Sequence, residues 1–381
     1  MEAAGMALTN APGFLMFSGT NDRALIALCR GMTKYSVPFG LVGRGKGDML
    51  KKSPYADHYL LDRTSETLHF EEICAAVDIA RSKYGNEEWV ICPTSEYLNI
   101  VLFPMRQQLA QKGITVATCE QTLYSRLSEK AAFRTYCEEL GVPPPEILEG
   151  DGAEHLAPPY VAKPKTNLSR TGRILYPYLV RNSQERERFL TEAESEEYYL
   201  ERFVEGESWY LLFYLSKDGK VTQGAQRNYL QQGMGKSILL ARAKDYPDVQ
   251  VRERFAKRLQ ADGYRGFIMV EVRRTGEGTA ISIEANPRCW GPLQLTLDAD
   301  MGLVEAFLSD HGHPVQPLTR SIQGRSYCWT GGMVQAMRSG KGLDRHGSRS
   351  EVIGRLLGAF SSDVYARRDS WSCLFADLHK R

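Results

Sequence analysis

Long apolar runs are absent from the sequence, and so is an excess of charge of either sign. No segment approaches the roughly 20 apolar residues that a membrane-spanning helix needs, and the start lacks a basic segment followed by an apolar one. The 48 basic and 46 acidic residues leave a formal charge of only +2, which disfavours a protein that binds nucleic acid through bulk charge. We therefore expect a cytoplasmic protein with neither a membrane nor a nucleic acid as a partner.

Clusters of metal-binding side chains are also lacking. The eight cysteines form no Cys-x-x-Cys pair, and the seven histidines include one close pair, His311 and His313, with no third ligand nearby. Because a structural zinc site needs several such ligands together, the sequence predicts reduced thiols and a histidine pair without a metal.

Both common glycine-rich phosphate-binding motifs are incomplete. The turn after the first expected strand, at 18–22, lacks the later glycines of the G-x-G-x-x-G dinucleotide fingerprint. Segment 231–236 contains glycines and a lysine, but Leu230 stands where a P-loop needs glycine. A nicotinamide or flavin site at the first turn is therefore disfavoured, and segment 231–236 is either a loop beside a substrate or a plain hairpin connection.

The patterning that is present predicts an α/β protein of more than one domain. Short apolar runs alternate with helix-like stretches in the first third of the chain, as in a parallel sheet covered by helices, and short strands and hairpins follow. The expected strands of the parallel sheet are 13–18, 39–42, 58–61, 88–92 and 115–118. We expect a small N-terminal α/β domain over 1–120, an α+β domain over 121–310 with a lid subdomain over roughly 150–205, and a C-terminal portion, 311–381, packed on the α+β domain.

The strongest local signal is a hairpin that carries two glutamates. A glycine-containing turn at 275–278 separates two strand-like segments, and an antiparallel register there places Glu271 opposite Glu284. Like charges that face each other within about 5.5 Å destabilise a sheet unless a cation lies between them. Strand alternation then adds Asn286 to the same face. The apolar neighbours are assigned to the opposite face: Ile268, Val270, Val272, Ile281 and Ile283.

Carboxylate and amide oxygens are the ligands that Mg²⁺ prefers, and phosphate oxygens commonly complete its shell. The hairpin therefore predicts a magnesium-nucleotide site formed by Glu271, Glu284 and Asn286. A solvated hairpin face with two glutamates is the alternative interpretation of this segment alone.

Three further segments precede the hairpin in a fixed order. A helix over 127–140 contains Lys130, a short apolar strand ends at Lys163, and Glu201 opens the string Glu-Arg-Phe-Val-Glu-Gly-Glu. Together with the hairpin and Arg288 at its end, these motifs resemble the ATP-grasp superfamily, specifically its carboxylate-amine ligases, over roughly residues 1 to 310. The resemblance implies an ATP-grasp α+β domain preceded by a small parallel-sheet domain, with ATP and Mg²⁺ as cofactors.

The resemblance also implies a role for each motif. Lys130, Lys163 and Ser169 would bind phosphates, Glu201 and the backbone of Arg202, Phe203 and Val204 would meet the adenine, and Glu207 would accept from the ribose. Arg288 would be the catalytic residue that stabilises the transferring phosphoryl group. The expected phosphate-covering loop around Ser169 departs from the family pattern, because it has Gly172 as its one glycine.

Simple electrostatics supports a phosphate-binding role for Lys163 and Lys130. Lys163, at the end of an apolar strand, needs an anionic partner, which a nucleotide phosphate would supply. Lys130, in the first turns of a helix, gains nothing from the helix dipole. A surface lysine and a lysine at a strand edge are the alternatives.

The predicted function is an ATP-dependent, ADP-forming ligase that activates a carboxylate as an acyl phosphate and joins it to an amine, with an amino acid or peptide as a substrate. Acceptor pockets are expected at 289–292 and in the region 311–342. A dinucleotide-dependent oxidoreductase that uses the N-terminal domain, or a non-catalytic nucleotide-binding regulatory protein, are the alternative functions. The resemblance leaves a homodimer open.

Overall fold

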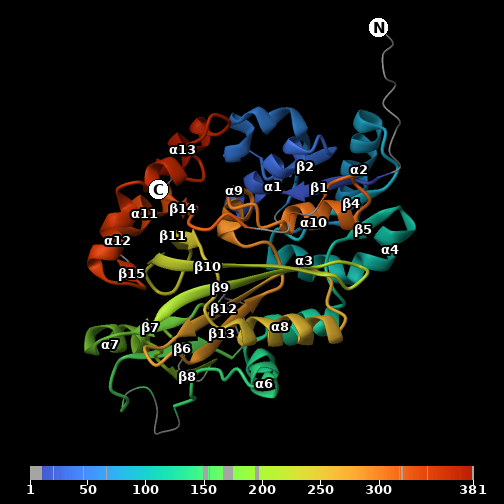
Figure 1. The fold of residues 1–381 in the computed structure, drawn as a ribbon. Helices are drawn as coiled ribbons and strands as arrows, with labels where there is room; N and C mark the ends of the chain where they lie inside the picture. Colours follow the sequence, from blue (N-terminus) through green and yellow to red (C-terminus); the bar gives the residue numbers. More distant parts are fainter. Residues whose placement is uncertain are drawn as a thin grey trace.

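A computed structural model describes residues 11–19, 21–45, 47–65, 67–148, 153, 155–165, 175–193, 197–316, 318, 321–340 and 342–379. These residues form a five-stranded, a three-stranded and a seven-stranded sheet. Figure 1 shows the N-terminal sheet above the large sheet and the three-stranded sheet below it. In the part of the chain that the structure describes, no helix has the length and apolar character needed to cross a membrane.

The N-terminal sheet is parallel, with strand order β3-β2-β1-β4-β5. Each strand overlaps one that the apolar runs predict, because strands covered by helices on both faces are almost continuously apolar. The strands are β1 (Gly13–Phe17), β2 (Phe39–Gly43), β3 (Tyr59–Asp62), β4 (Trp89–Ile91) and β5 (Ile114–Val116). The helices are α1 (Asp22–Lys34), α2 (Phe70–Tyr84), α3 (Glu96–Leu102) and α4 (Arg106–Gln111).

The helix expected over 127–140 is interrupted. It forms two helices, α5 (Gln121–Ser128) and α6 (Lys130–Leu140), because Glu129 adopts an extended conformation with ψ 128°. Lys130 is therefore the first residue of α6. The helix ends at Gly141, whose φ of +71° suits glycine.

The three-stranded sheet has the order β7-β6-β8 and a small apolar core of its own around Tyr160 and Phe189. Its strands are β6 (Tyr160–Pro164), β7 (Tyr178–Val180) and β8 (Tyr198–Arg202), and α7 (Ser183–Glu192) packs against β7. These elements lie within the residues expected to form the lid subdomain.

The large sheet has the order β13-β12-β9-β10-β11-β14, and β15 pairs with β10. Its strands are β9 (Glu207–Leu215), β10 (Val221–Gln232), β11 (Ile238–Ala243), β12 (Gly266–Arg274), β13 (Ala280–Asn286), β14 (Ser326–Cys328) and β15 (Leu343–Arg345). Alternate residues of β9 are buried on opposite faces: Leu211 packs in the core with α6 and α8 (Val249–Ala261), and Leu212 packs in the core with α1. The sheet therefore joins the N-terminal domain to the two helices on its other face (Figure 1).

The C-terminal part of the chain contacts the N-terminal domain as well as the large sheet. Its helices are α11 (Thr330–Arg338), α12 (Arg349–Leu356) and α13 (Trp371–Leu378), and α9 (Gln294–Asp298) and α10 (Leu303–Asp310) precede it. Helix α13 packs on the 3₁₀ helix Met49–Lys52, between β2 and β3, and on α11. The packing is thus broader than the expected contact with the α+β domain alone.

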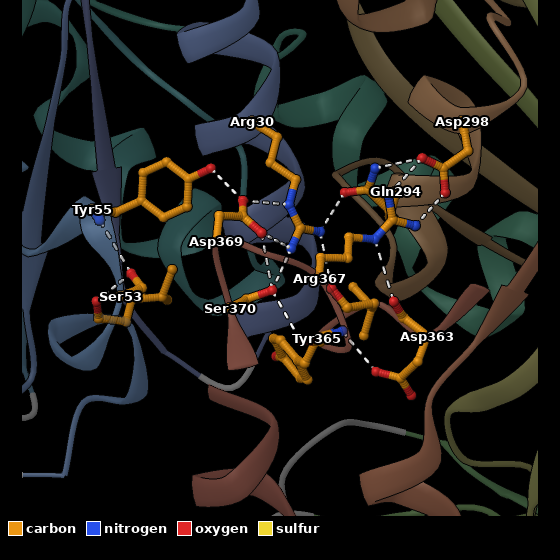
Figure 2. A network of polar contacts seen from close by, with 12 residues as sticks. Arg30, Ser53, Tyr55, Gln294, Asp298, Asp363, Tyr365, Arg367, Asp369 and Ser370 are labelled. Carbon is orange, nitrogen blue, oxygen red and sulfur yellow. Dashed lines mark hydrogen bonds and ion pairs between the residues drawn. The ribbon is translucent and has the colours of Figure 1, made fainter. Parts of the chain in front are cut away.

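A network of polar contacts fixes this C-terminal part to α1 and α9 (Figure 2). Arg30 of α1 donates to both carboxylate oxygens of Asp369, at 2.8 and 2.9 Å, and to Gln294 of α9 at 2.7 Å. Tyr55 donates to Asp369 at 2.7 Å, and Arg367 pairs with Asp298 at 2.9 Å. Burial acts to raise the pKa of Asp369, but the hydrogen bonds and charge of Arg30, with Tyr55, outweigh it and lower the pKa to about 2.

Replacement of Asp369 by asparagine is expected to lower the free energy of unfolding by about 1–2 kcal/mol at pH 7, allowing for solvent at a side chain that is 28% exposed. Because the folded pKa lies below the ordinary 3.8, the contribution is present above about pH 4 and is lost as the pH falls towards 2. Chemical denaturation at pH 7 and pH 3 measures this difference. Asp78→Asn, at an exposed carboxylate, is the control, and an equal loss at both pH values would contradict the electrostatic account.

Candidate active site

A cleft of about 1130 Å³ lies where the three sheets meet. Its walls come from β6 and β8, from the β12–β13 hairpin, from the loop between β10 and β11, and from the starts of α1 and α3. The predicted site residues that line it are Lys163, Glu201, Arg202, Phe203, Val204, Glu271, Glu284, Asn286 and Arg288. The structure thus gathers in one place residues that are up to 125 positions apart in the sequence, counting from 163 to 288.

Two predicted residues, Lys130 and Glu207, are not among those that line the cleft. Burial lowers the pKa of Lys130 while the charge of Glu284 opposes this, so Lys130 lies within electrostatic reach of the hairpin. The Glu207 carboxylate accepts from Trp209 Nε1 at 2.9 Å and pairs with Arg227 at 3.1 Å. Ser169 and the rest of the expected phosphate-covering loop lie outside the described residues.

The two hairpin glutamates face each other as predicted, with Glu271 of β12 paired with Glu284 of β13. The strand next to this pair contains a β-bulge. Val272 pairs with Ser282, which leaves Ile283 without a partner in the ladder. The bulge also corrects the predicted faces. Ile283 was expected opposite the glutamates but lines the cleft with them, since one extra residue shifts the alternation of β13.

Glu271 is the buried member of the pair, with 4% of its surface exposed. Burial raises its pKa, the nearby charge of Arg273 at 3.2 Å opposes the shift, and the charge of Glu284 adds to it. Ser208 donates a long hydrogen bond to the same carboxylate at 3.4 Å. A buried carboxylate that faces a second one is a position where added positive charge is strongly favourable.

Asn286 and Arg288 extend the exposed side of the pair. Asn286 donates to Glu284 Oε1 at 2.8 Å and accepts from Arg288 Nη2 at 2.9 Å, while Arg288 Nη1 donates to the Cys289 carbonyl at 3.0 Å. The guanidinium of Arg288 is therefore held in place at the end of β13, beside the carboxylates.

Lys163 and Glu201 form an ion pair of 2.8 Å across β6 and β8. Arg134 of α6 binds the other oxygen of Glu201 at 2.7 Å, and Lys163 also donates to the carbonyl of the bulged residue Ile283 at 3.1 Å. The ammonium group of Lys163 thus connects the three-stranded sheet to the acidic hairpin. The anionic partner that its burial requires is supplied within the protein by Glu201.

Several polar residues of the cleft were not predicted. Asn21 and Arg23 of the first turn after β1 line it, although the rule that ligands bind at the carboxyl ends of parallel strands could have indicated them. Arg273 lies two residues from Glu271, so strand alternation could have found it as well. No local signal indicates His346, because it reaches the cleft through the pairing of β15 with β10.

His346 binds Arg273 and the β10–β11 hairpin. Its Nδ1 accepts from Arg273 at 2.6 Å, which leaves Nε2 to donate to Gln231 at 2.8 Å. Burial and the charge of Arg273 keep its pKa well below the ordinary value, so it is a neutral support for Arg273.

The expected acceptor regions are only partly in the cleft. Trp290, Gly291 and Pro292 line it, as expected for 289–292. Of the region 311–342, the lining includes Gly342, and the next four residues, 343–346, continue the wall. Segment 231–236 ends β10 and begins the hairpin connection to β11, and this connection lines the cleft.

No family model and no curated protein sequence matches this chain. Among solved structures, it is similar to a biotin carboxylase–ATP complex from Campylobacter jejuni, with a TM-score of 0.61 and 15% identity over 84% of this chain and 76% of that one. N5-carboxyaminoimidazole synthetase from Staphylococcus aureus gives a TM-score of 0.59 and 11% identity over 86% and 85%. An ADP complex of N5-carboxyaminoimidazole ribonucleotide synthetase gives 0.58 and 15% over 87% and 86%.

The chain has the fold of these neighbours, an ATP-grasp fold. The predicted fold class, a small parallel-sheet domain followed by an ATP-grasp α+β domain, is confirmed. Proteins that share a fold at such low sequence identity can have different functions, so the activity is argued from the residues of the cleft.

Proposed function

We propose that the chain is an ATP-dependent, ADP-forming ligase that activates a carboxylate as an acyl phosphate and joins it to an amine, with an amino acid or peptide as one substrate. The observation that carries the proposal is the opposed pair Glu271 and Glu284, with Asn286 and Arg288 beside it, in a cleft that Lys163 also lines. The structural neighbours support it, because the biotin carboxylase structure contains ATP and another neighbour contains MgADP.

The end of the cleft near the three-stranded sheet suits a nucleotide base and its phosphates. The backbone of Phe203 and Val204, just past the end of β8, lies beside apolar side chains of the same wall, Val161, Leu179, Met269 and Ile283. The Arg202 N–H is not available, because it donates to the Glu146 carbonyl at 2.9 Å. Lys163 stands between this apolar region and the acidic hairpin, where the phosphates of a nucleotide would lie. A planar base between apolar side chains, with backbone hydrogen bonds at its edge, is the usual form of such a site.

The acidic hairpin fits Mg²⁺. Two carboxylates and one amide oxygen are hard ligands, and two glutamates on facing strands favour a cation in addition to Arg273, which pairs with Glu271. No group of three or more His, Cys, Asp or Glu side chains is placed to hold a metal anywhere in the described residues, so substrate oxygens and water would complete the shell. When bound, Mg²⁺ would neutralise charge on the phosphate groups.

The protein's own contribution to the chemistry is positioning and charge. Arg288, held by Asn286 and Cys289, would present its guanidinium to the transferring phosphoryl group and to the acyl phosphate. The acyl phosphate replaces a poor leaving oxygen by phosphate, which the amine then displaces, so no covalent nucleophile on the protein is needed.

The direct test is incubation with ATP, Mg²⁺ and pooled amino acids. We expect release of ADP and phosphate, and hydroxylamine should trap a hydroxamate from the activated carboxylate. Release of AMP and pyrophosphate would mean an adenylate intermediate and would contradict the proposal.

Lys163→Ala should weaken ATP binding about 10- to 100-fold, the usual effect of losing a charge-assisted contact. Arg134 continues to neutralise Glu201 in this variant, so the fold should persist. The measurement is the rise in melting temperature with ATP, and Lys257→Ala, at an exposed lysine of α8, is the control. An unchanged ATP shift in Lys163→Ala would contradict the assignment, and a shift with NADH but none with ATP would support the oxidoreductase instead.

A further inference from the structure

Arg23 is a buried cation on the N-terminal side of the cleft. It belongs to the first turn of α1, lines the cleft and is 8% exposed. Its Nη2 donates to Ser237 Oγ at 2.9 Å, and its Nη1 lies 3.4 Å from the Ile238 carbonyl and from the Tyr327 hydroxyl. All three of these partners are uncharged.

Among the residues that the structure describes, no carboxylate forms an ion pair with Arg23. The acidic residue next to it, Asp22, pairs with Arg44 at 2.9 Å instead. Because a buried charge is costly unless an opposite charge accompanies it, the position of Arg23 favours an anion that enters from the cleft. Lys163 shows the contrast, since it has Glu201 within the protein.

Two neighbours fix the orientation of the Arg23 guanidinium. The ring of Trp329 stacks on it, with 3.8 Å between Cζ and the ring centroid. On another side lies Gly291, where an added Cβ would come within 2.9 Å of Nη2 and 3.0 Å of Cζ. Glycine at this position therefore leaves the space that the guanidinium occupies.

The hydrogen bonds leave one edge of the guanidinium available. Nη1 has two acceptors and Nη2 has one, and Nε has no hydrogen-bond partner among the residues that the structure describes. Nε and Nη2 share one edge of the guanidinium, and with two hydrogens Nη2 can donate once more beside Ser237. The Nε–Nη2 edge is the one that binds two oxygens of a carboxylate or a phosphate.

Arg23 is on the side of the cleft away from the nucleotide end. Its contacts are with β11, β14 and the 290–292 turn, whereas Lys163 lies in the three-stranded sheet and Phe203 directly follows β8 of that sheet. Figure 1 shows β11 and β14 at the upper edge of the large sheet, α1 above the sheet, and β6 and β8 below it. Asn21, two residues before Arg23, donates to the carbonyl of Cys289, the residue that follows Arg288, at 3.1 Å. It therefore connects the Arg23 side of the cleft to the segment that carries Arg288.

We propose that Arg23 binds an anionic group of a substrate, a carboxylate or a phosphate, that the reaction leaves intact. This inference rests on the proposed function, which assigns Arg288 to the reacting group and so leaves Arg23 for a second anion. The substrate class is thus an acid that keeps a negative charge after ligation, such as an amino acid joined through its amine or a phosphorylated small molecule.

The test uses the full chain and three probes: succinate, inorganic phosphate and the neutral succinamide. Binding is measured by calorimetry and by the rise in melting temperature, with and without a non-hydrolysable ATP analogue that keeps phosphate out of the nucleotide site. We expect succinate or phosphate to bind and succinamide not to bind. Succinate binding without phosphate binding identifies a carboxylate subsite, and the reverse identifies a phosphate subsite.

Two variants attribute the binding to Arg23. Arg23→Gln should weaken the anion at least tenfold and leave the shift caused by the ATP analogue unchanged, and Arg188→Gln, at an exposed arginine of α7, is its control. Gly291→Ala keeps the charge but displaces the guanidinium, so it should also weaken the anion, whereas Gly354→Ala, which meets no atom within 4 Å, should not.

Equal anion binding in wild type, Arg23→Gln and Gly291→Ala would overturn the inference, as would the absence of binding by both anions in the wild type. Failure of the proposed function has a different signature: either the ATP analogue gives no shift in the wild type, or ATP with Mg²⁺ and pooled amino acids releases no ADP, whatever the anions do.

Discussion

Replacement of Glu284 by glutamine should lower ATP turnover about 100-fold or more, the scale of losing one charged contact in a transition state. The substitution removes the charge but keeps the volume, and glutamine can still accept the hydrogen bond from Asn286. Glu284 is exposed and faces a like charge on Glu271, so its neutralisation should not lower the melting temperature. ADP release and the melting temperature, measured on the same preparation, separate the site from the fold.

Glu277→Gln is the matched control for Glu284→Gln. Glu277 is an exposed glutamate in the turn of the same hairpin, so the variant makes the same change in net charge near the same strands. Full ATP turnover in Glu284→Gln would remove Glu284 from the metal site, and equal losses in both variants would point to a general effect of hairpin charge.

Arg288→Lys should lower kcat about 100- to 1,000-fold while it changes the affinity for ATP only slightly. The guanidinium of Arg288 spans the Asn286 side chain and the Cys289 carbonyl, and its planar fork can bind a phosphoryl group through two bonds. Lysine keeps the charge but has no fork, so the contact is lost mainly where charge develops in the transition state.

The comparison for Arg288→Lys is Arg188→Lys, at an arginine that is 67% exposed and pairs with Glu192 within α7. Steady-state kinetics gives kcat and KM, and calorimetry gives the affinity for ATP. A variant that binds ATP poorly but turns over at the normal rate would place Arg288 in nucleotide binding and not in the reaction.

Much of the fold was predictable because burial leaves a mark on local sequence. The five parallel strands are apolar runs, and β12 and β13 surround a glycine-containing turn. The break at Glu129 has no such mark, since neither glycine nor proline stands there. Strands β14 and β15 have three residues each, too few to show an alternation, and their places are fixed by pairing with distant strands.

The candidate site was predictable where its residues follow one another along a strand. Glu284, Asn286 and Arg288 are two apart, which places them together whatever the rest of the chain does. Arg23 and His346 come to the cleft from opposite ends of the sequence, and only the packing of α1 and β15 brings them there. The bulge at Ile283 could not be foreseen, because an extra residue in a strand looks like any other apolar residue.

Ile283 is a residue that the pairing of β13 does not use. Glu284 and Ser282 are opposite the adjacent residues Glu271 and Val272, so a hairpin one residue shorter could keep all of these partners. What the shorter hairpin would lose is the carbonyl that receives Lys163 and the apolar side chain in the cleft. The length of β13 can therefore change the lining of the cleft without changing the strand pairing of the sheet. Deletion of Ile283 should alter which ligand the cleft binds while the sheet stays folded.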